Sequence, residues 1–327
     1  YPVGELQVDH ELARLMAMIR PDSPLLLERV LAQVTAESSP SSDLHHLIVA
    51  ARNRAARSSE QRGEIARALV QLRYKVDSRK LKLDSNWDPR LTEMYLELVK
   101  LDPALPQAVI EQPGFGLSDH AIYLKPLSPD NLQSALDLIA GRIVETEDYP
   151  WTAEIVRLLG RSTRPGHRQL LREQLGNYSI QGVVLSVLAG QASPLDRPHF
   201  VDGLESADAG VVGACLSAIA KLPVSKDPRE LVRLVYNLRR LNHDETTWRL
   251  RESVVLLLRR ATGRQFGFVL GKEGYKPQQQ VVDGWTSFIA KAHPAQYQAM
   301  ERDSEVDLAA LKKRLEMIEW EPCCTLV

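Results

Sequence analysis

The sequence predicts an all-α fold in which short helices stack in pairs, the arrangement called an α-solenoid. Apolar residues recur with the spacing of amphipathic helices along nearly the whole chain, and the alternation typical of strands is nearly absent. Helix-start signals recur between the apolar rows. In the second half these rows repeat at offsets of roughly 30 to 40 residues, which is the range of two-helix repeats. The 327 residues are enough for one extended repeat domain or two compact ones.

Residues 1–127 are predicted to form N-terminal helical repeats that are less regular than the following ones. A first helix is expected after Asp9, and Ser23 and Ser58 are expected N-caps, since a hydroxyl oxygen can accept a hydrogen bond from a free backbone N–H. Gln61 completes a capping box with Ser58. The apolar rows of these helices are Leu12, Leu15, Met16 and Ile19; Leu27, Val30, Leu31 and Val34; Leu44, Leu47, Ile48 and Ala51; Ile65, Leu69 and Leu72; and Leu91, Met94, Tyr95 and Leu98. Short helices are also expected at 105–110 and 120–124.

Residues 128–263 are predicted to form more regular helix pairs. Ser128 before Pro129 marks the first start. The helical runs expected next are 151–159, 167–175, 180–188, 200–204, 207–222, 229–241 and 246–261. The run 207–220 is rich in Ala and Gly, which let a neighbouring helix approach closely, while Val212, Leu216 and Ile219 fill the core between layers.

Residues 264–327 are predicted to form a glycine-containing loop followed by C-terminal capping helices. Gly263, Gly267, Gly271 and Gly274 interrupt helicity, and helices are expected at 278–292 and 303–318. The glycine spacing differs from a phosphate-binding Gly-x-Gly-x-x-Gly turn, and no strand precedes it. A nucleotide site is therefore not expected in this loop.

The segments 206–222 and 246–263 resemble HEAT repeats, so the expected solenoid is of the HEAT/armadillo-like type. The wider chain is similar to the HEAT-type helical region of large planctomycete multidomain proteins. The matching segments are short and scattered: residues 1–4 leading into 10–15, 84–90 around Trp87-Asp88-Pro89, 115–120, and 261–267 through to Trp285.

Proteins of that family commonly combine a dehydrogenase-like β-propeller, a HEAT region and a C-terminal c-type haem domain. The resemblance implies export, and hence a periplasmic or extracellular location, for the protein of which this chain is expected to be a part. The chain has no Cys-x-x-Cys-His motif, so we expect no covalent haem and no cofactor in it. The resemblance transfers no catalytic residues to this chain.

Charge and hydropathy argue against two classes of partner. Forty-one Lys and Arg against forty-two Asp and Glu give a formal charge of −1, so no global positive field favours nucleic acid. No apolar stretch approaches the length of a membrane span. An anionic partner would have to be bound by a local basic patch.

Two local groups of arginines are the candidate partner-binding residues. Between residues 52 and 82, ten Lys and Arg stand against three acidic residues, a net charge of +7. Guanidinium groups can bind carboxylates or phosphates with two hydrogen bonds at once. The candidates in this group are Arg52, Arg54, Arg57 and Arg62, and those in the second group are Arg239, Arg240, Trp248 and Arg249. The alternative is a solvated helix face whose charges are balanced by acidic neighbours in space.

No catalytic or metal-binding pattern stands out. The pair His45-His46 is adjacent, and neighbouring helix residues point about 100° apart, so we expect one ring to pack and the other to meet solvent. Cys215 is expected to be a buried, inert thiol. Cys323-Cys324-Thr325-Leu326-Val327 superficially matches a prenylation box, but terminal Val is not typical of one. Packing is the expected role of Trp87, Trp151, Trp248, Trp285 and Trp320.

The sequence therefore favours a non-enzymatic helical-repeat scaffold that binds a protein partner or a neighbouring domain, within a larger exported redox protein. A close variant of this hypothesis names a cytochrome or haem domain as the partner of the Arg-rich rim. The alternative is an enzyme on a HEAT-like scaffold, such as an alkylpurine DNA glycosylase, which would use Trp248 among arginines on a basic concave face.

Overall fold

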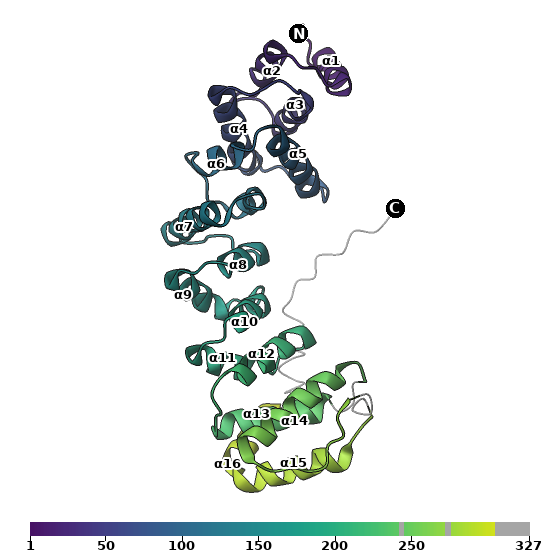
Figure 1. Ribbon diagram of the computed structural model, residues 1–327, viewed down its shortest axis with the longest axis vertical. Helices are drawn as coiled ribbons and strands as arrows, with labels where there is room; N and C mark the ends of the chain where they lie inside the picture. Colours follow the sequence, from purple (N-terminus) through teal and green to yellow (C-terminus); the bar gives the residue numbers. More distant parts are fainter. Residues whose placement is uncertain (242–244, 272–275, 305–327) are drawn as a thin grey trace. The chain divides into compact units, whose positions relative to one another are not determined.

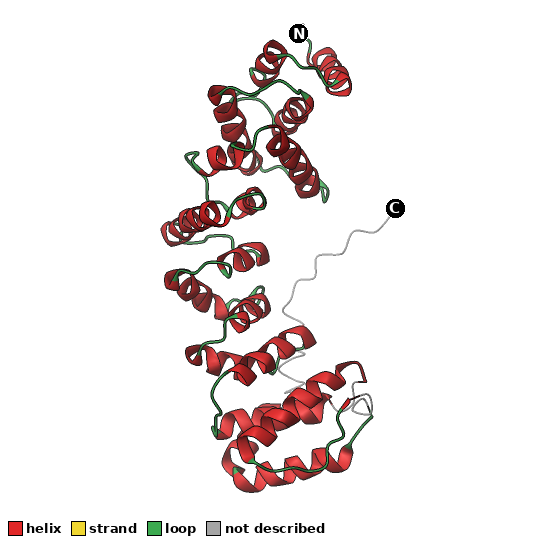
Figure 2. Cartoon of the chain, in the orientation of Figure 1, coloured by secondary structure: helices red, strands yellow, loops and turns green. Residues whose placement is uncertain are grey.

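The computed structural model describes residues 1–241, 245–271 and 276–304, and within these ranges the chain is helical without any strand (Figures 1 and 2). The predicted all-α class is confirmed. The chain divides into two compact units, Tyr1–Glu173 and Gln174–Val327, which we describe separately. The three segments expected from the sequence remain a prediction.

The first unit contains nine α-helices and one 3₁₀-helix in its described residues. They are α1 (Leu6–Ile19), α2 (Pro24–Leu31), α3 (Pro40–Arg52), α4 (Ser59–Ser78), α5 (Trp87–Leu101), α6 (Leu105–Ile110), η1 (Ser118–Leu124), α7 (Pro129–Glu145), α8 (Ala153–Leu159) and α9 (Pro165–Glu173). Helices α1, α3 and α5 contact one another in series, and so do α2, α4 and α6 (Figure 1). Contacts of α3 with both α2 and α4 join the two rows. From α1 to α6, alternate helices therefore share a layer.

The second unit repeats this alternation. Its helices are η2 (Gln174–Gly176), α10 (Gln181–Gly190), η3 (Pro194–Asp196), α11 (Arg197–Gly203), α12 (Ala209–Lys221), α13 (Pro228–Leu241), η4 (Glu245–Thr247), α14 (Trp248–Thr262), α15 (Gln279–Ala292) and α16 (Pro294–Ser304). Helices α10, α12 and α14 form one row, and α11, α13 and α15 form the other. Helix α16 contacts α13 and α15.

Side-chain caps fix the helix starts that the sequence predicts. The hydroxyls of Ser23, Ser58 and Ser128 accept hydrogen bonds from backbone N–H groups of the first turns of α2, α4 and α7. Ser58 and Gln61 form the expected capping box. Pro24 and Pro129 occupy the first turn, where a missing N–H costs no helical hydrogen bond.

A small residue of α12 allows close packing, as predicted: a Cβ atom added to Gly213 would lie 3.2 Å from Leu250 Cδ2 of α14. A glycine of the preceding helix, outside the predicted segment, packs more closely still. A Cβ atom added to Gly203 at the end of α11 would lie 2.7 Å from the Cys215 sulfur and 2.9 Å from Leu185 Cδ1 of α10. Helices α10, α11 and α12 therefore meet where only glycine fits. Cys215 is completely buried, and burial raises the pKa of its thiol to about 12, so the thiol stays protonated at neutral pH.

The sequence-based interpretation of the first helix is wrong in its start and in the face it buries. Helix α1 begins at Leu6, and Asp9 lies inside its first turn, where the carboxylate accepts N–H bonds from Val3 (2.6 Å) and Gly4 (3.0 Å). Leu15 and Ile19, expected in the core, are 53% and 75% exposed. Periodicity identifies an apolar face but not the neighbour that covers it, and in α1 the buried side carries Asp9 and Ala13 instead.

The C-terminal region contains a helix that the sequence analysis missed. Helix α16 starts at Pro294, directly after α15, and its mostly polar sequence lacks a strong apolar row. The glycine loop is confirmed where it is described: Gly263 ends α14 with φ +70°, and Gly267 and Gly271 also have positive φ. Nearly all of the expected helix 303–318, together with Gly274, Trp320, Cys323 and Cys324, lies outside the described residues.

Candidate functional site

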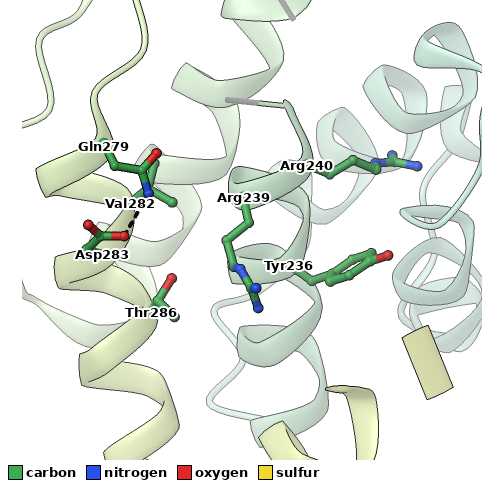
Figure 3. A pocket seen from close by; sticks show the side chains of 7 residues that line it. All are labelled: Tyr236, Arg239, Arg240, Gln279, Val282, Asp283 and Thr286. Atoms are coloured by element: carbon green, nitrogen blue, oxygen red, sulfur yellow. Dashed lines mark hydrogen bonds between the residues drawn. The ribbon is translucent and has the colours of Figure 1, made fainter. Parts of the chain in front are cut away.

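The second unit contains a pocket of about 520 Å³ between α13 and α15. Its lining comprises Tyr236, Arg239 and Arg240 of α13, and Gln279, Val282, Asp283 and Thr286 of α15 (Figure 3). Two of the candidate arginines expected from the sequence thus lie at this pocket. The polar side chains of both helices give it groups of either charge together with hydrogen-bonding groups.

Packing of α15 positions one wall of the pocket. Trp285 is completely buried, and the ring of Phe266 from the glycine loop packs edge-on against it, with ring centroids 4.7 Å apart. A Cβ atom on Gly284 would approach the Phe266 ring to 2.8 Å, so the loop lies directly on α15. With Trp285 turned into the core, Gln279, Asp283 and Thr286, at intervals of four and three residues, share the face toward the pocket.

Arg239 links α13 to the terminal helix α16. Its guanidinium forms an ion pair with Glu301 and donates a hydrogen bond to the Tyr297 hydroxyl at 2.8 Å. The hydrogen bond from Arg239 lowers the pKa of the Glu301 carboxyl and raises the pKa of Arg239 itself. Both side chains are more than a third exposed, so water screens the pair and its contribution to stability is small.

Arg240 has a different environment from its neighbour. Its guanidinium points away from α15 (Figure 3) and donates to the carbonyls of Leu204 (3.2 Å) and Ser206 (2.9 Å), just beyond the end of α11. It thereby satisfies carbonyls that the helix end leaves free. Arg240 therefore lines the pocket with the base of its side chain, while its guanidinium serves the packing of α13 against the end of α11.

The α15 wall supplies polar groups that can bind a ligand. Gln279 donates a hydrogen bond of 2.7 Å to Asp283, whose carboxylate is exposed. The Thr286 hydroxyl oxygen is buried and has no hydrogen-bond partner among the described residues. Buried hydroxyls are nearly always hydrogen-bonded, so this group is a candidate contact for a bound molecule. The pocket combines these groups with the Arg239 guanidinium, and this set of donors and acceptors can bind a polar ligand.

The first arginine group lies in the first unit, and half of it serves the fold. Arg57 donates to the carbonyls of Ala50 and Asn53, both at 2.8 Å, and so closes the end of α3. Arg62 forms an ion pair of 2.7 Å with Asp102. Arg54 is exposed and Arg52 is half-buried. The binding role proposed for this group from the sequence stays a prediction, with two of its four members engaged elsewhere.

Trp248 and Arg249 lie at the start of α14, outside the pocket lining. The Arg249 guanidinium lies 5.2 Å from the centroid of the Trp248 ring, a cation–π contact between sequence neighbours. The sequence analysis missed the four pocket residues of α15. Their shared helix face could have revealed them, but polar residues on one face are also typical of a solvated helix.

The histidines His10, His45 and His46 form a cluster between α1 and α3, with ring centroids 4.7 to 5.7 Å apart. His46 is buried; its Nδ1 donates a hydrogen bond to the Ser42 carbonyl at 2.8 Å, and its Nε2 accepts one from the Tyr1 hydroxyl at 3.0 Å. His45 is half-buried. Across residues 1–241, 245–271 and 276–304, no group of His, Cys, Asp and Glu side chains has an arrangement that could hold a metal ion.

None of the helices in the described ranges has the length and apolar character needed to cross a membrane, as expected from the sequence. Comparison of the chain with models of protein families, with curated proteins and with solved structures found no match.

Proposed function

We propose that this chain is a HEAT/armadillo-like α-solenoid that acts as a non-enzymatic scaffold and binds a protein partner through the pocket between α13 and α15. The partner is a separate protein or a neighbouring domain of the same polypeptide. The resemblance to HEAT regions of multidomain redox proteins makes such a domain a natural candidate.

The alternating rows of helices support the solenoid part of this proposal. In α1 to α6 and in α10 to α15, alternate helices stack in series and consecutive helices join the two rows, as expected for stacked helix pairs. Such stacks present side chains along their surface, and a partner can insert a side chain between two helices of one row.

The composition of the pocket supports the proposal that it binds a protein partner. Arg239 on one wall faces Asp283 and the Thr286 hydroxyl on the other, and the Thr286 hydroxyl has no partner among the residues that the structure describes; these groups suit a polar side chain of a folded partner. The pocket opens between two helices whose relative positions are fixed by Trp285 and by the contact of α16 with Arg239. A preformed site of this kind costs little ordering on binding.

The test is site-specific photo-crosslinking in the producing cell, with a photoreactive residue at position 279 on the pocket face. We expect a discrete cross-linked product, identified by mass spectrometry, that Thr286→Trp abolishes because the indole fills the pocket. Ser287→Trp is the matched control, since residue 287 is the exposed neighbour on the same helix. A product that survives Thr286→Trp, or that forms equally from position 280, would contradict the pocket as the binding site.

A further inference from the structure

Three of the eight histidines of the chain lie together where α1 packs against α3. The ring of His10 on α1 has its centroid 4.7 Å from that of His45 and 5.7 Å from that of His46, and the two rings of α3 are 5.4 Å apart. The His10 Nε2 also lies 3.3 Å from the hydroxyl oxygen of Ser42 on α3. A proton on any of these rings therefore sets a positive charge close to the two others, where a second positive charge is repelled.

The hydrogen bonds of the two α3 rings fit neutral imidazoles. Because the Nδ1 of His46 donates to the Ser42 carbonyl, its Nε2 is left as the acceptor for the Tyr1 hydroxyl. Burial raises the pKa of that hydroxyl to about 12, and Arg29 of α2 donates to the carbonyl of the same tyrosine at 3.4 Å. The Nε2 of His45 is buried and has no hydrogen-bond partner among the described residues. A proton added at either Nε2 brings a charge into this contact, which costs free energy.

The surroundings of His45 and His46 favour their neutral forms. Burial lowers the pKa of both side chains, and the charge of His10 lowers both further. The backbone carbonyls of His10 and Ser42 act in the opposite direction on His45 and His46 respectively, but burial is the larger effect. The closed contact therefore excludes protons that a free histidine would bind.

The charged groups that act on the cluster from α1, α3 and α4 already have partners. On α1, Arg14, whose charge also lowers the pKa of His45, pairs with Glu11 at 3.0 Å. The carboxylate of Asp9 accepts two backbone N–H bonds, and that of Asp43 on α3 forms an ion pair with Lys75 of α4. Both carboxylates raise the pKa of His46, but less than burial lowers it.

Helix α1 is anchored by few other contacts. It packs mainly against α3, and among its residues 7–19 only Asp9 and Ala13 are buried. Elements that bury little apolar surface open at a small cost in free energy compared with unfolding of the whole protein. The histidine contact is therefore a large part of what holds α1 in place.

We propose that the contact of His10, His45 and His46 is a pH-sensitive switch, which holds α1 on α3 while the rings are neutral and releases α1 when they bind protons. In the released form the rings meet water and bind protons at the ordinary pKa of 6.5, whereas the closed form excludes protons from His45 and His46. The closed form therefore loses stability as the pH falls below 6.5. Release uncovers the side of α3 that α1 covers at neutral pH. This switch lies in the first unit and is independent of the pocket and of the function proposed for it.

Hydrogen exchange of the whole chain at pH 7.5 and 5.5, read by mass spectrometry and corrected for intrinsic exchange rates, tests the proposal. The opening constant of residues 6–19 should be at least about tenfold larger at the lower pH. The reason is that each histidine that binds a proton only in the open form contributes a factor of up to about ten. An equal opening constant at both pH values overturns the proposal.

Variants that cannot bind a proton identify the groups responsible. The double variant His45→Phe with His46→Asn should lose most of the pH dependence, since Phe keeps the ring contact and Asn can keep the donor to the Ser42 carbonyl. The single variants His10→Gln and His45→Phe should each reduce the pH dependence, so the test remains decisive if the double variant does not fold. Far-UV circular dichroism at pH 7.5 establishes which variants are folded.

The matched control is His120→Asn, which changes a buried histidine of the same unit outside this contact. It should leave the response of α1 to pH unchanged. An undiminished pH dependence of α1 in the folded variants of His10, His45 and His46 contradicts the proposal. An equal reduction in His120→Asn contradicts it as well, because the response would then not arise in the contact between α1 and α3.

Discussion

At the scale of single residues, His120 shows how burial determines protonation. It is 1% exposed and stacks against the Phe115 ring, with centroids 5.4 Å apart. Its Nδ1 accepts N–H bonds from Gly116 and Leu117, which leaves Nε2 to donate to the Val70 carbonyl at 3.2 Å. Burial lowers the pKa of His120 to about 4, and the nearby Arg142 adds to this effect. The ring is therefore neutral in the folded protein.

This protonation state predicts a loss of stability in acid. Between pH 6.5 and about 4 the unfolded chain binds a proton at His120 that the folded chain excludes, so the free energy of unfolding falls as pH decreases through this window. The full loss is on the order of 3 kcal/mol. Urea unfolding at pH 7, 5.5 and 4 should show a smaller pH dependence in His120→Asn than in the unaltered protein. The same dependence in both would show that His120 is not responsible.

At the scale of helices, a buried ion pair joins α3 to α4. Lys75 of α4 lies 2.5 Å from the carboxylate of Asp43 on α3, and their side chains are 8% and 0% exposed. The Lys75 ammonium also donates to the Thr35 carbonyl and to the Ser38 hydroxyl, so each of its hydrogens can have a partner. This network fixes the loop before α3 against the next helix.

Removing one partner of this pair should destabilise the first unit by about 3 to 5 kcal/mol, because it leaves the other charge buried without compensation. We expect this loss for Lys75→Met. The double variant Lys75→Met with Asp43→Leu should recover much of it, since no unpaired charge then remains. Denaturant unfolding of Lys75→Met, of Asp43→Leu and of the double variant measures the coupling between the two residues. If the losses of the two single variants simply add in the double variant, the residues are not coupled and the prediction is wrong.

At the scale of the whole molecule, the two compact units predict that unfolding occurs in more than one step. His120→Asn lies in the first unit and should shift one transition. Gly203→Ala lies in the second and should shift another, because its methyl group would collide with Cys215 and Leu185. Hydrogen exchange along a denaturant series, read by mass spectrometry, assigns each transition to its peptides. One transition that both variants shift together would contradict independent units.

The sequence by itself determined the helical class, most helix starts and much of the core. Serine caps, prolines in first turns and apolar rows act within a few residues along the chain, so they can be identified without knowledge of distant neighbours. The burial of Cys215 and the close approach at Gly213 were also predictable, because Ala and Gly in a helix are typical of close approach, whereas the contact of Gly203 with Cys215 was not predicted. Arg239 and Arg240 were identified as candidates from charge alone.

Only the tertiary structure decided which surfaces are covered and which groups meet. Helix α1 packs against α3 with the side that carries Asp9 and Ala13, and so its apolar residues Leu15 and Ile19 remain exposed. The pocket lies between α13 and α15, which α14 and the glycine loop separate along the chain, and α16 supplies the carboxylate that pairs with Arg239. These contacts join residues that are tens of positions apart in the sequence. Caps and apolar rows reflect only neighbours within a few residues, so they cannot show which distant residues meet in space.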